Sequence, residues 1–166
     1  AARAPAAPVA LPAGAGPILQ EDAAKPLLAA YGIAVPRERL VTGRDGLAAA
    51  VAALEGPLAM KVISDDILHK AAIGGVRLGV SGPEAAARAR DEITAAVAAA
   101  CPTARVDGIL LQEMAEGFEL VLGARVDPVW GPMVMAGLGG NLTEIVADVA
   151  LHTAPLDADQ ARAMLA

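Results

Sequence analysis

The sequence predicts an α+β fold of two abutting subdomains, and three observations support this prediction. Helix-like and strand-like patterns alternate over residues 17–106. Residues 107–155 are mostly strand-like, with short turns of Gly, Pro and Asp between the strands. Hydrophobic residues make up 55% of the 166 residues, but aromatic residues only 2%, so the core must be aliphatic. We expect subdomains over 17–106 and 107–166 with a ligand cleft between them.

Composition and charge exclude several classes of protein. The chain has 13 Lys and Arg against 19 Asp and Glu, a net charge of −6, which argues against nucleic-acid binding. No apolar run reaches the roughly 18–20 residues that a membrane span needs, so no membrane partner is expected. The single cysteine, Cys101, excludes an internal disulfide and fits a reducing, cytoplasmic location. Residues 1–16 are rich in Ala, Pro and Gly and predict an extended linker, not a signal peptide.

The N-terminal third is expected to hold two helices around one strand. Apolar residues at helical spacing predict a helix from Leu19 that ends at Gly32, with Pro26 in or near its first turn. A short strand is expected near Leu40. A second helix is expected over 44–54, where a Gly-Pro pair follows it.

The middle of the chain predicts two strands, a long helix and a third strand. The run LAMKVIS at 58–64 is apolar except for one lysine and predicts a buried strand. A loop over 64–75 then leads to an alternating strand at 76–80. A helix opened by SGPE is expected to run to about Ala100, and a strand is expected at 107–114.

The last third predicts a meander followed by a helix. Three strand-like stretches are separated by short turns, at 118–128, 131–139 and 142–155. A final helix is expected to begin near Leu156–Ala158.

Lys61 is the first candidate for chemistry, because it interrupts an apolar strand. One interpretation is a lysine that snorkels from a strand edge. The other is a fixed cation on the floor of a phosphate site, since an ammonium pairs well with phosphate oxygens.

The loop that follows holds His69 and the pair Gly74-Gly75. Adjacent glycines allow the backbone to approach a ligand closely and to present its N–H groups, but they can also form only a turn. His69 by itself is equally compatible with a solvated or capping side chain.

Carboxylates and glycines after residue 107 form the remaining candidates. Glu113 ends an apolar strand and could simply face solvent, with Gln112 beside it. Glu119 interrupts the run FELVL, where a half-buried carboxylate needs a partner such as a pair of sugar hydroxyls. The glycine-rich turn that contains Gly139 and Gly140 could cradle an anion or form a tight hairpin, and Glu144 and Asp148 follow it in the sequence.

Motifs of other enzyme classes are absent from the sequence. Two widely separated histidines and one cysteine are too few for a structural zinc site, and no metal ligand is assigned. The sequence contains neither the GxSxG serine-hydrolase motif nor the GxxxxGK[ST] phosphate loop.

The order and spacing of these features are more specific than any one of them. The strings MKVISDDILHKAAIGGVRLGV and GILLQEMAEGFELVLGARVDPVWGPMVMAGLGGNLTEIVADVALHTAPL closely resemble the ATP-grasp domain of the NDP-forming acyl-CoA synthetases. This family includes the ADP-forming acetate–CoA ligases and is more distantly similar to the β subunit of succinyl-CoA synthetase. The resemblance covers about residues 19–166 and implies an ATP-grasp fold.

The resemblance also implies residue roles. The position of Lys61 corresponds to a lysine that contacts the ATP phosphates, and Glu113 to a glutamate beside the adenine. Glu119 resembles the glutamate that holds the ribose hydroxyls, and His69 resembles a phosphate carrier. Because a carrier must leave its own site, we expect His69 to be exposed on a mobile loop over 64–75, with small residues around it and Gly74-Gly75 as a flexible exit. The residues assigned to the nucleotide on this basis are Lys61, Gln112, Glu113, Glu119, Gly74, Gly75, Gly139 and Gly140.

The reaction implied by the resemblance is ADP-forming acid–CoA ligation. Acyl-CoA and phosphate give an acyl-phosphate, whose phosphoryl group passes to a histidine of a partner CoA-ligase module, then to the loop histidine and then to ADP. The implied cofactors are ATP or ADP with Mg²⁺. The CoA-binding module is expected in the same chain or as a separate subunit, and the 166-residue fragment alone is expected to be inactive.

Three departures from the family pattern qualify this implication. The family loop reads HKSD before its glycines, whereas Ala71 and Ala72 stand here. His152 replaces the usual arginine before the APL string. An acidic-Asn-Pro-Leu string that helps to hold magnesium is missing, so the C-terminal subdomain is expected to be incomplete and the metal ligands to lie outside this fragment.

Two alternative functions remain open from the sequence. One is a degenerate, regulatory synthetase-like domain of a lysine acetyltransferase, which the altered Ala71–Ala72 loop favours and the retained His69 opposes. The other is a different ATP-grasp ligase, such as a carboxylate–amine ligase, in which His69 would have no role.

Overall fold

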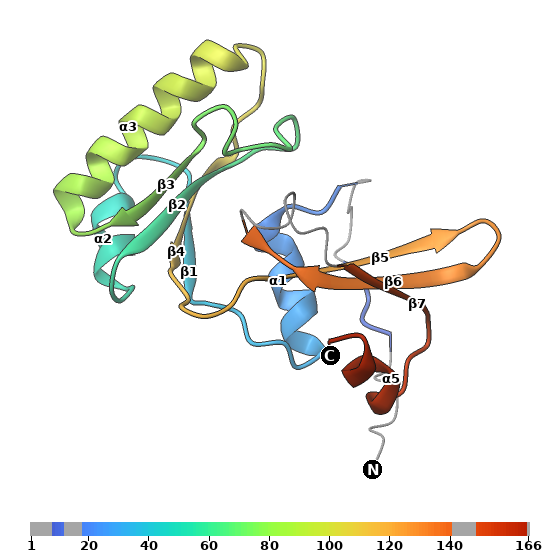
Figure 1. The fold of residues 1–166 in the computed structure, drawn as a ribbon. Coiled ribbons are helices and arrows are strands. Elements are labelled where there is room, and N and C mark those ends of the chain that lie inside the picture. The colour runs from blue at the N-terminus through green and yellow to red at the C-terminus, as the bar shows by residue number, and fades with distance from the viewer. Residues whose placement is uncertain (1–7, 12–17, 141–148, 166) are drawn as a thin grey trace. The chain divides into compact units, whose positions relative to one another are not determined.

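The structure is a computed structural model that describes residues 8–11, 18–140 and 149–165 (Figure 1). The chain divides into two compact units, the first ending at Ala115 and the second beginning at Glu116. The expected boundary after residue 106 is therefore misplaced, because the strand that follows it pairs inside the sheet of the first unit. The helices and antiparallel strands of the two units confirm the predicted α+β class.

The first unit is built on a four-stranded antiparallel sheet with the strand order β1-β4-β2-β3. In this sheet β2 lies between β4 and β3, and Lys61 of β2 pairs with Leu110 of β4 and Val76 of β3. The strands are β1 (Glu38–Val41), β2 (Leu58–Ile63), β3 (Val76–Val80) and β4 (Gly108–Glu113).

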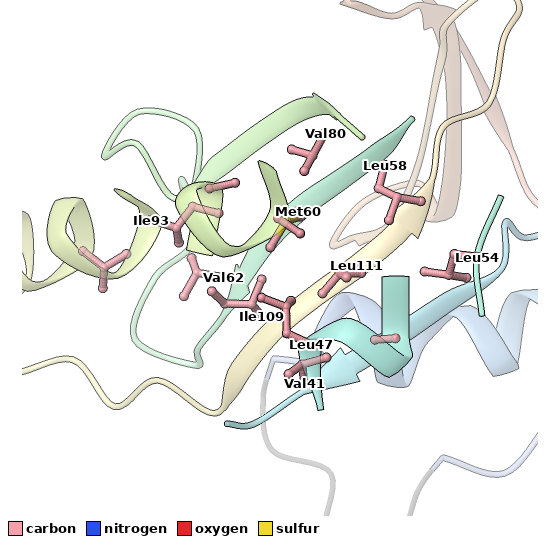
Figure 2. Close-up of a cluster of buried hydrophobic side chains, with 14 of the residues drawn as sticks. Val41, Leu47, Leu54, Leu58, Met60, Val62, Val80, Ile93, Ile109 and Leu111 are labelled. Atoms are coloured by element: carbon pink, nitrogen blue, oxygen red, sulfur yellow. The ribbon is translucent and has the colours of Figure 1, made fainter. Parts of the chain in front are cut away.

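Helices α2 (Leu47–Ala52) and α3 (Pro83–Ala100) bury one face of this sheet. The buried residues of α3 recur every three or four positions and form one apolar stripe. Figure 2 shows the side chains of the two helices and of β2 and β4 meeting in this core. Met60 and Leu111 are fully buried at its centre. No aromatic side chain is among the buried core residues of the described chain, which confirms the expected aliphatic core.

Helix α1 (Glu21–Ala30) confirms the first predicted helix but not the position of its proline. Gln20 is the N-cap, so Pro26 lies inside the helix and beyond its first turn. Proline has no N–H, and Pro26 cannot donate the helical bond to the carbonyl of Asp22. The chain leaves the helix through Gly32, whose φ of 82° is in the left-handed region that glycine tolerates.

The second unit contains a three-stranded antiparallel meander, β5-β6-β7. Its elements are β5 (Leu120–Asp127), β6 (Gly131–Leu138), β7 (Val149–Thr153) and helix α5 (Ala158–Ala163). The meander and the final helix are thus confirmed, although β5 begins two residues later than expected. The first part of the third predicted strand lies outside the described residues. A capping box fixes the start of α5, because the Asp157 carboxylate accepts from the Gln160 N–H at 2.8 Å and the Gln160 side chain accepts from the Asp157 N–H.

No helix in the described parts of the chain has both the length and the apolar character to cross a bilayer.

The core of the first unit makes a direct prediction about stability. Leu111→Ala should lower the free energy of unfolding by about 2–5 kcal/mol, because it leaves a cavity between the sheet and its two helices. Urea denaturation followed by circular dichroism measures this loss. Leu78→Ala is the matched control, since Leu78 is 65% exposed on β3, and an equal loss in both variants would contradict the placement of the core.

Candidate functional site

Lys61 lies on the face of the sheet that points away from α2 and α3. Its neighbours Met60 and Val62 belong to the core under those helices, and side chains alternate between faces along a strand. The Lys61 ammonium donates to Glu21 Oε1 at 2.7 Å and to Gln112 Oε1 at 2.9 Å. Because β2 is paired on both sides, Lys61 does not lie on an edge strand of the sheet.

Lys25 of helix α1 donates hydrogen bonds to the same two oxygens that Lys61 contacts, Glu21 Oε1 and Gln112 Oε1. Its ammonium donates to Glu21 Oε1 at 2.8 Å and to Gln112 Oε1 at 3.0 Å, and it also pairs with Glu38 of β1. The side chain of Lys25 is 11% exposed and that of Lys61 is 22% exposed. The two lysines therefore form one cluster with Glu21, Glu38 and Gln112, which we call the lysine cluster. It links α1, β1, β2 and β4.

Charge in the lysine cluster shifts the titration of two groups. Burial raises the pKa of Glu21, but the hydrogen bonds and charges of Lys25 and Lys61 outweigh it, and the pKa lies below its ordinary value. Glu21 is therefore ionised at neutral pH. Burial lowers the pKa of Lys70, with Glu21 opposing this shift and Lys61 adding to it. Lys70, next to His69 on the following loop, is thus a third cation within the electrostatic range of Glu21.

Both ends of the His69 loop are fixed to the first unit. Ile67 is buried in the core with only 4% of its surface exposed. At the far end the Gly75 N–H donates to the Lys70 carbonyl at 2.7 Å, and the Gly75 carbonyl accepts from Val62 N–H at 2.9 Å. A Cβ at Gly75 would lie 2.8 Å from the Lys70 carbonyl oxygen. Gly75 therefore closes a tight turn, and the expectation that the glycine pair forms a flexible exit is wrong.

His69 itself is exposed between these anchors, as expected. Its neighbour Leu68 is 65% exposed. Within the described residues the imidazole makes no hydrogen bond or ion pair. Nothing in that part of the chain holds the ring nitrogens, so both are accessible to another group.

Gln112 and Glu113 point to opposite faces of β4, although both were predicted to contact one nucleotide. Glu113 Oε1 accepts from the Glu55 N–H at 2.8 Å and pairs with Arg37 at 3.3 Å. Of the two neighbours, only Gln112 belongs to the lysine cluster.

The remaining predicted residues meet in the second unit. The Gly139 N–H donates to the Glu119 carbonyl at 2.8 Å. The side chain of Glu119 lies against Gly140, whose φ of 70° suits glycine. Glu119 is exposed rather than half-buried, because it precedes β5 and stands beside the fully exposed Phe118. Glu144 and Asp148 lie outside the described residues.

A hollow of about 650 Å³ also opens on the second unit. Its lining includes Trp130, Met133, Met135 and Leu151. None of the predicted site residues lines it, so the hollow does not extend the candidate site.

Sequence reasoning missed Glu21, Lys25 and Glu38. The four-residue spacing of Glu21 and Lys25 on a predicted helix signals an ion pair, but not the contact of that pair with Lys61. Among the described residues, no three His, Cys, Asp or Glu side chains are placed to hold a metal ion.

The sequence matches one family profile and several proteins of known activity. The sequence profile of the family described as "ATP-grasp domain" matches residues 10–166. The ADP-forming acetate–CoA ligase I of Archaeoglobus fulgidus is 37% identical over 84% of this chain, which spans 20% of that protein. The β subunit of the ADP-forming acetate–CoA ligase II of Pyrococcus furiosus is 35% identical over 87% of the chain, which spans 62% of the subunit.

Solved structures agree with the sequence comparisons. The dinucleotide-forming acetyl-coenzyme A synthetase 1 of Ca. Korarchaeum cryptofilum, in complex with coenzyme A, Ca-AMPCP and HgCl+, matches with a TM-score of 0.84 and 36% identity. The match covers 89% of this chain and 65% of that chain. A second structure of the same protein, in complex with coenzyme A and Mg-AMPPCP, is described as having its phosphohistidine segment pointing towards the nucleotide binding site. It matches with a TM-score of 0.70 and 32% identity. The match covers 89% of this chain and 62% of that chain.

The two-unit α+β architecture, the family profile over residues 10–166 and the match to solved structures lead to one conclusion: the chain belongs to the ATP-grasp family and has the ATP-grasp fold.

Proposed function

We propose that this chain is the nucleotide-binding part of an ADP-forming acyl-CoA synthetase. The observation that carries the proposal is the lysine cluster beside a loop that exposes His69, which has no hydrogen-bond or ion-pair partner among the described residues. The relatives named as ADP-forming acetate–CoA ligases support the same reaction class. Because the chain spans only part of each relative, the activity belongs to a larger assembly.

The lysine cluster is the proposed binding site for the nucleotide phosphates. Phosphoryl transfer depends mainly on positioning and on the neutralisation of developing charge. Lys61 is the more exposed of the two clustered lysines and would supply a charge-assisted contact to a phosphate oxygen. Glu119, with Gly139 and Gly140, is proposed to bind the ribose, and Glu113 to lie beside the adenine. Mg²⁺ is proposed to accompany the nucleotide.

His69 is proposed to carry the phosphoryl group. One nitrogen of its imidazole would attack the phosphorus of a phosphohistidine on the CoA-ligase module, forming a new N–P bond as the donor N–P bond breaks. An oxygen of the terminal phosphate of ADP would then attack this phosphorus, breaking the His69 N–P bond and giving ATP. Imidazole suits both steps, because it is nucleophilic near neutral pH.

The proposed partner is a CoA-binding module, in the same chain or as a separate subunit. Two relatives support these alternatives: this chain spans only 20% of the Archaeoglobus protein, and the Pyrococcus relative, of which it spans 62%, is named as a β subunit.

Lys61→Ala tests the phosphate site. Loss of one charge-assisted contact, worth roughly 1.5–3 kcal/mol, should weaken ATP binding by about 10- to 150-fold, as measured by isothermal titration calorimetry on the protein that contains this chain. Arg77→Ala is the control: it removes a cation from the neighbouring strand, where Arg77 pairs with Glu92 of α3. An unchanged dissociation constant in Lys61→Ala would refute this placement.

His69→Ala tests the carrier role. The variant should lose acyl-CoA-dependent phosphorylation of ADP while it keeps its affinity for ATP, because His69 makes no contact with the lysine cluster in the described chain. Incubation of the complete enzyme with radiolabelled ATP and magnesium should label His69 with phosphate that is acid-labile and base-stable. Full turnover by His69→Ala would exclude the carrier role.

A further inference from the structure

Glu21 already binds the Lys61 ammonium, which the proposed function assigns to a nucleotide phosphate. In the described structure the Lys61 ammonium donates to two oxygens of the lysine cluster, Glu21 Oε1 at 2.7 Å and Gln112 Oε1 at 2.9 Å. A carboxylate and a phosphate present the same kind of acceptor to an ammonium, a negatively charged oxygen. The two anions therefore compete for one donor.

The formal charges around Lys61 cancel while Glu21 is ionised. Lys25, Lys61 and Lys70 face three carboxylates, those of Glu21, Glu38 and Asp22. The Asp22 carboxylate contributes a negative charge near Lys70. One of its oxygens is buried and has no hydrogen-bond partner in the described structure. An incoming phosphate consequently finds the charge of Lys61 already compensated and must displace Glu21 to use it.

Lys25 allows Glu21 to release Lys61 without becoming an unpaired charge. The Lys25 ammonium lies 2.8 Å from Glu21 Oε1, so this carboxylate keeps a partner when Lys61 turns to another anion. A partly buried carboxylate left with no partner would oppose the exchange strongly. Lys25 is the less exposed lysine, which fits a cation that stays in place.

Helix α1 brings Glu21 to the sheet through polar contacts. No residue of α1 is buried, and the preceding Gln20 donates to the Ser64 carbonyl at 2.7 Å and to Asp65 at 2.8 Å. Exchange at Lys61 can therefore proceed without opening the apolar core.

From these contacts we infer that Glu21 is an internal competitor of the nucleotide phosphates for Lys61 and thereby sets the affinity of the site for phosphate. This inference rests on the proposed function. It makes Glu21 a residue that acts through Lys61 to lower phosphate affinity, with Lys25 as the cation that compensates Glu21 when phosphate is bound.

Glu21→Gln in the complete protein tests the inference. Glutamine keeps an acceptor oxygen of the same size but removes the negative charge, so ADP should bind about 3- to 10-fold more tightly, the effect of one partly exposed charge. Adenosine, which has no phosphate, should bind with unchanged affinity. Glu92→Gln is the control, because it removes the same charge from a residue that pairs with Arg77 and does not belong to the lysine cluster. It should leave the affinities for ADP and for adenosine unchanged.

A double variant separates the inference from the proposed function. If Glu21 acts through Lys61, the gain from Glu21→Gln should vanish in a Lys61→Ala background. Weaker or unchanged ADP binding by Glu21→Gln overturns the inference, as does a gain that persists without Lys61. Glu21→Ala, which removes charge and acceptor together, should also tighten ADP binding, and circular dichroism of each variant confirms that α1 is retained. Unchanged ADP binding by Lys61→Ala alone refutes the phosphate site itself.

Discussion

An ammonium group on an interior strand must find oxygen partners, and this requirement organises the first unit. Lys61 sits between strands on both sides, so its side chain cannot reach solvent past a sheet edge. Its charge is satisfied by Gln112 from the adjacent strand and by Glu21 from a helix that contributes nothing to the apolar core. One face of the sheet therefore packs in the aliphatic core under α2 and α3, and the opposite face carries the lysine cluster next to buried apolar residues such as Leu110 and Ile63.

The sequence indicates the candidates on the sheet better than their partners. Lys61 could be singled out because it breaks an apolar run, and Gln112 because it lies beside Glu113 at the end of one. Glu21 lies 40 positions from Lys61, and Lys25 lies 87 positions from Gln112. Such contacts depend on how helix α1 meets the sheet, and the pattern of a single helix does not specify that.

Strand β4 shows the difference between predicting an element and predicting its neighbours. Its position in the chain suggested the start of a second subdomain, but it pairs with both β1 and β2. The residues from Gly108 to Leu111 are all buried. A continuous apolar run of this kind is typical of a strand covered on both faces, and it is the sequence signal that favours an interior position in the first sheet.

The His69 loop combines an exposed tip with a fixed base, and the two properties have separate origins in the sequence. Ile67 enters the core, and Gly75 closes a turn that a side chain at that position would obstruct. Between them the exposed Ala71 and Ala72 offer the imidazole neither a hydrogen-bonding side chain nor bulk. The sequence predicted the exposure of His69 from these small residues, whereas the anchoring turn depends on a backbone bond between Gly75 and Lys70. Under the proposed function, these anchors confine the movement of a phosphoryl group carried on His69 to the residues between Ile67 and Gly75.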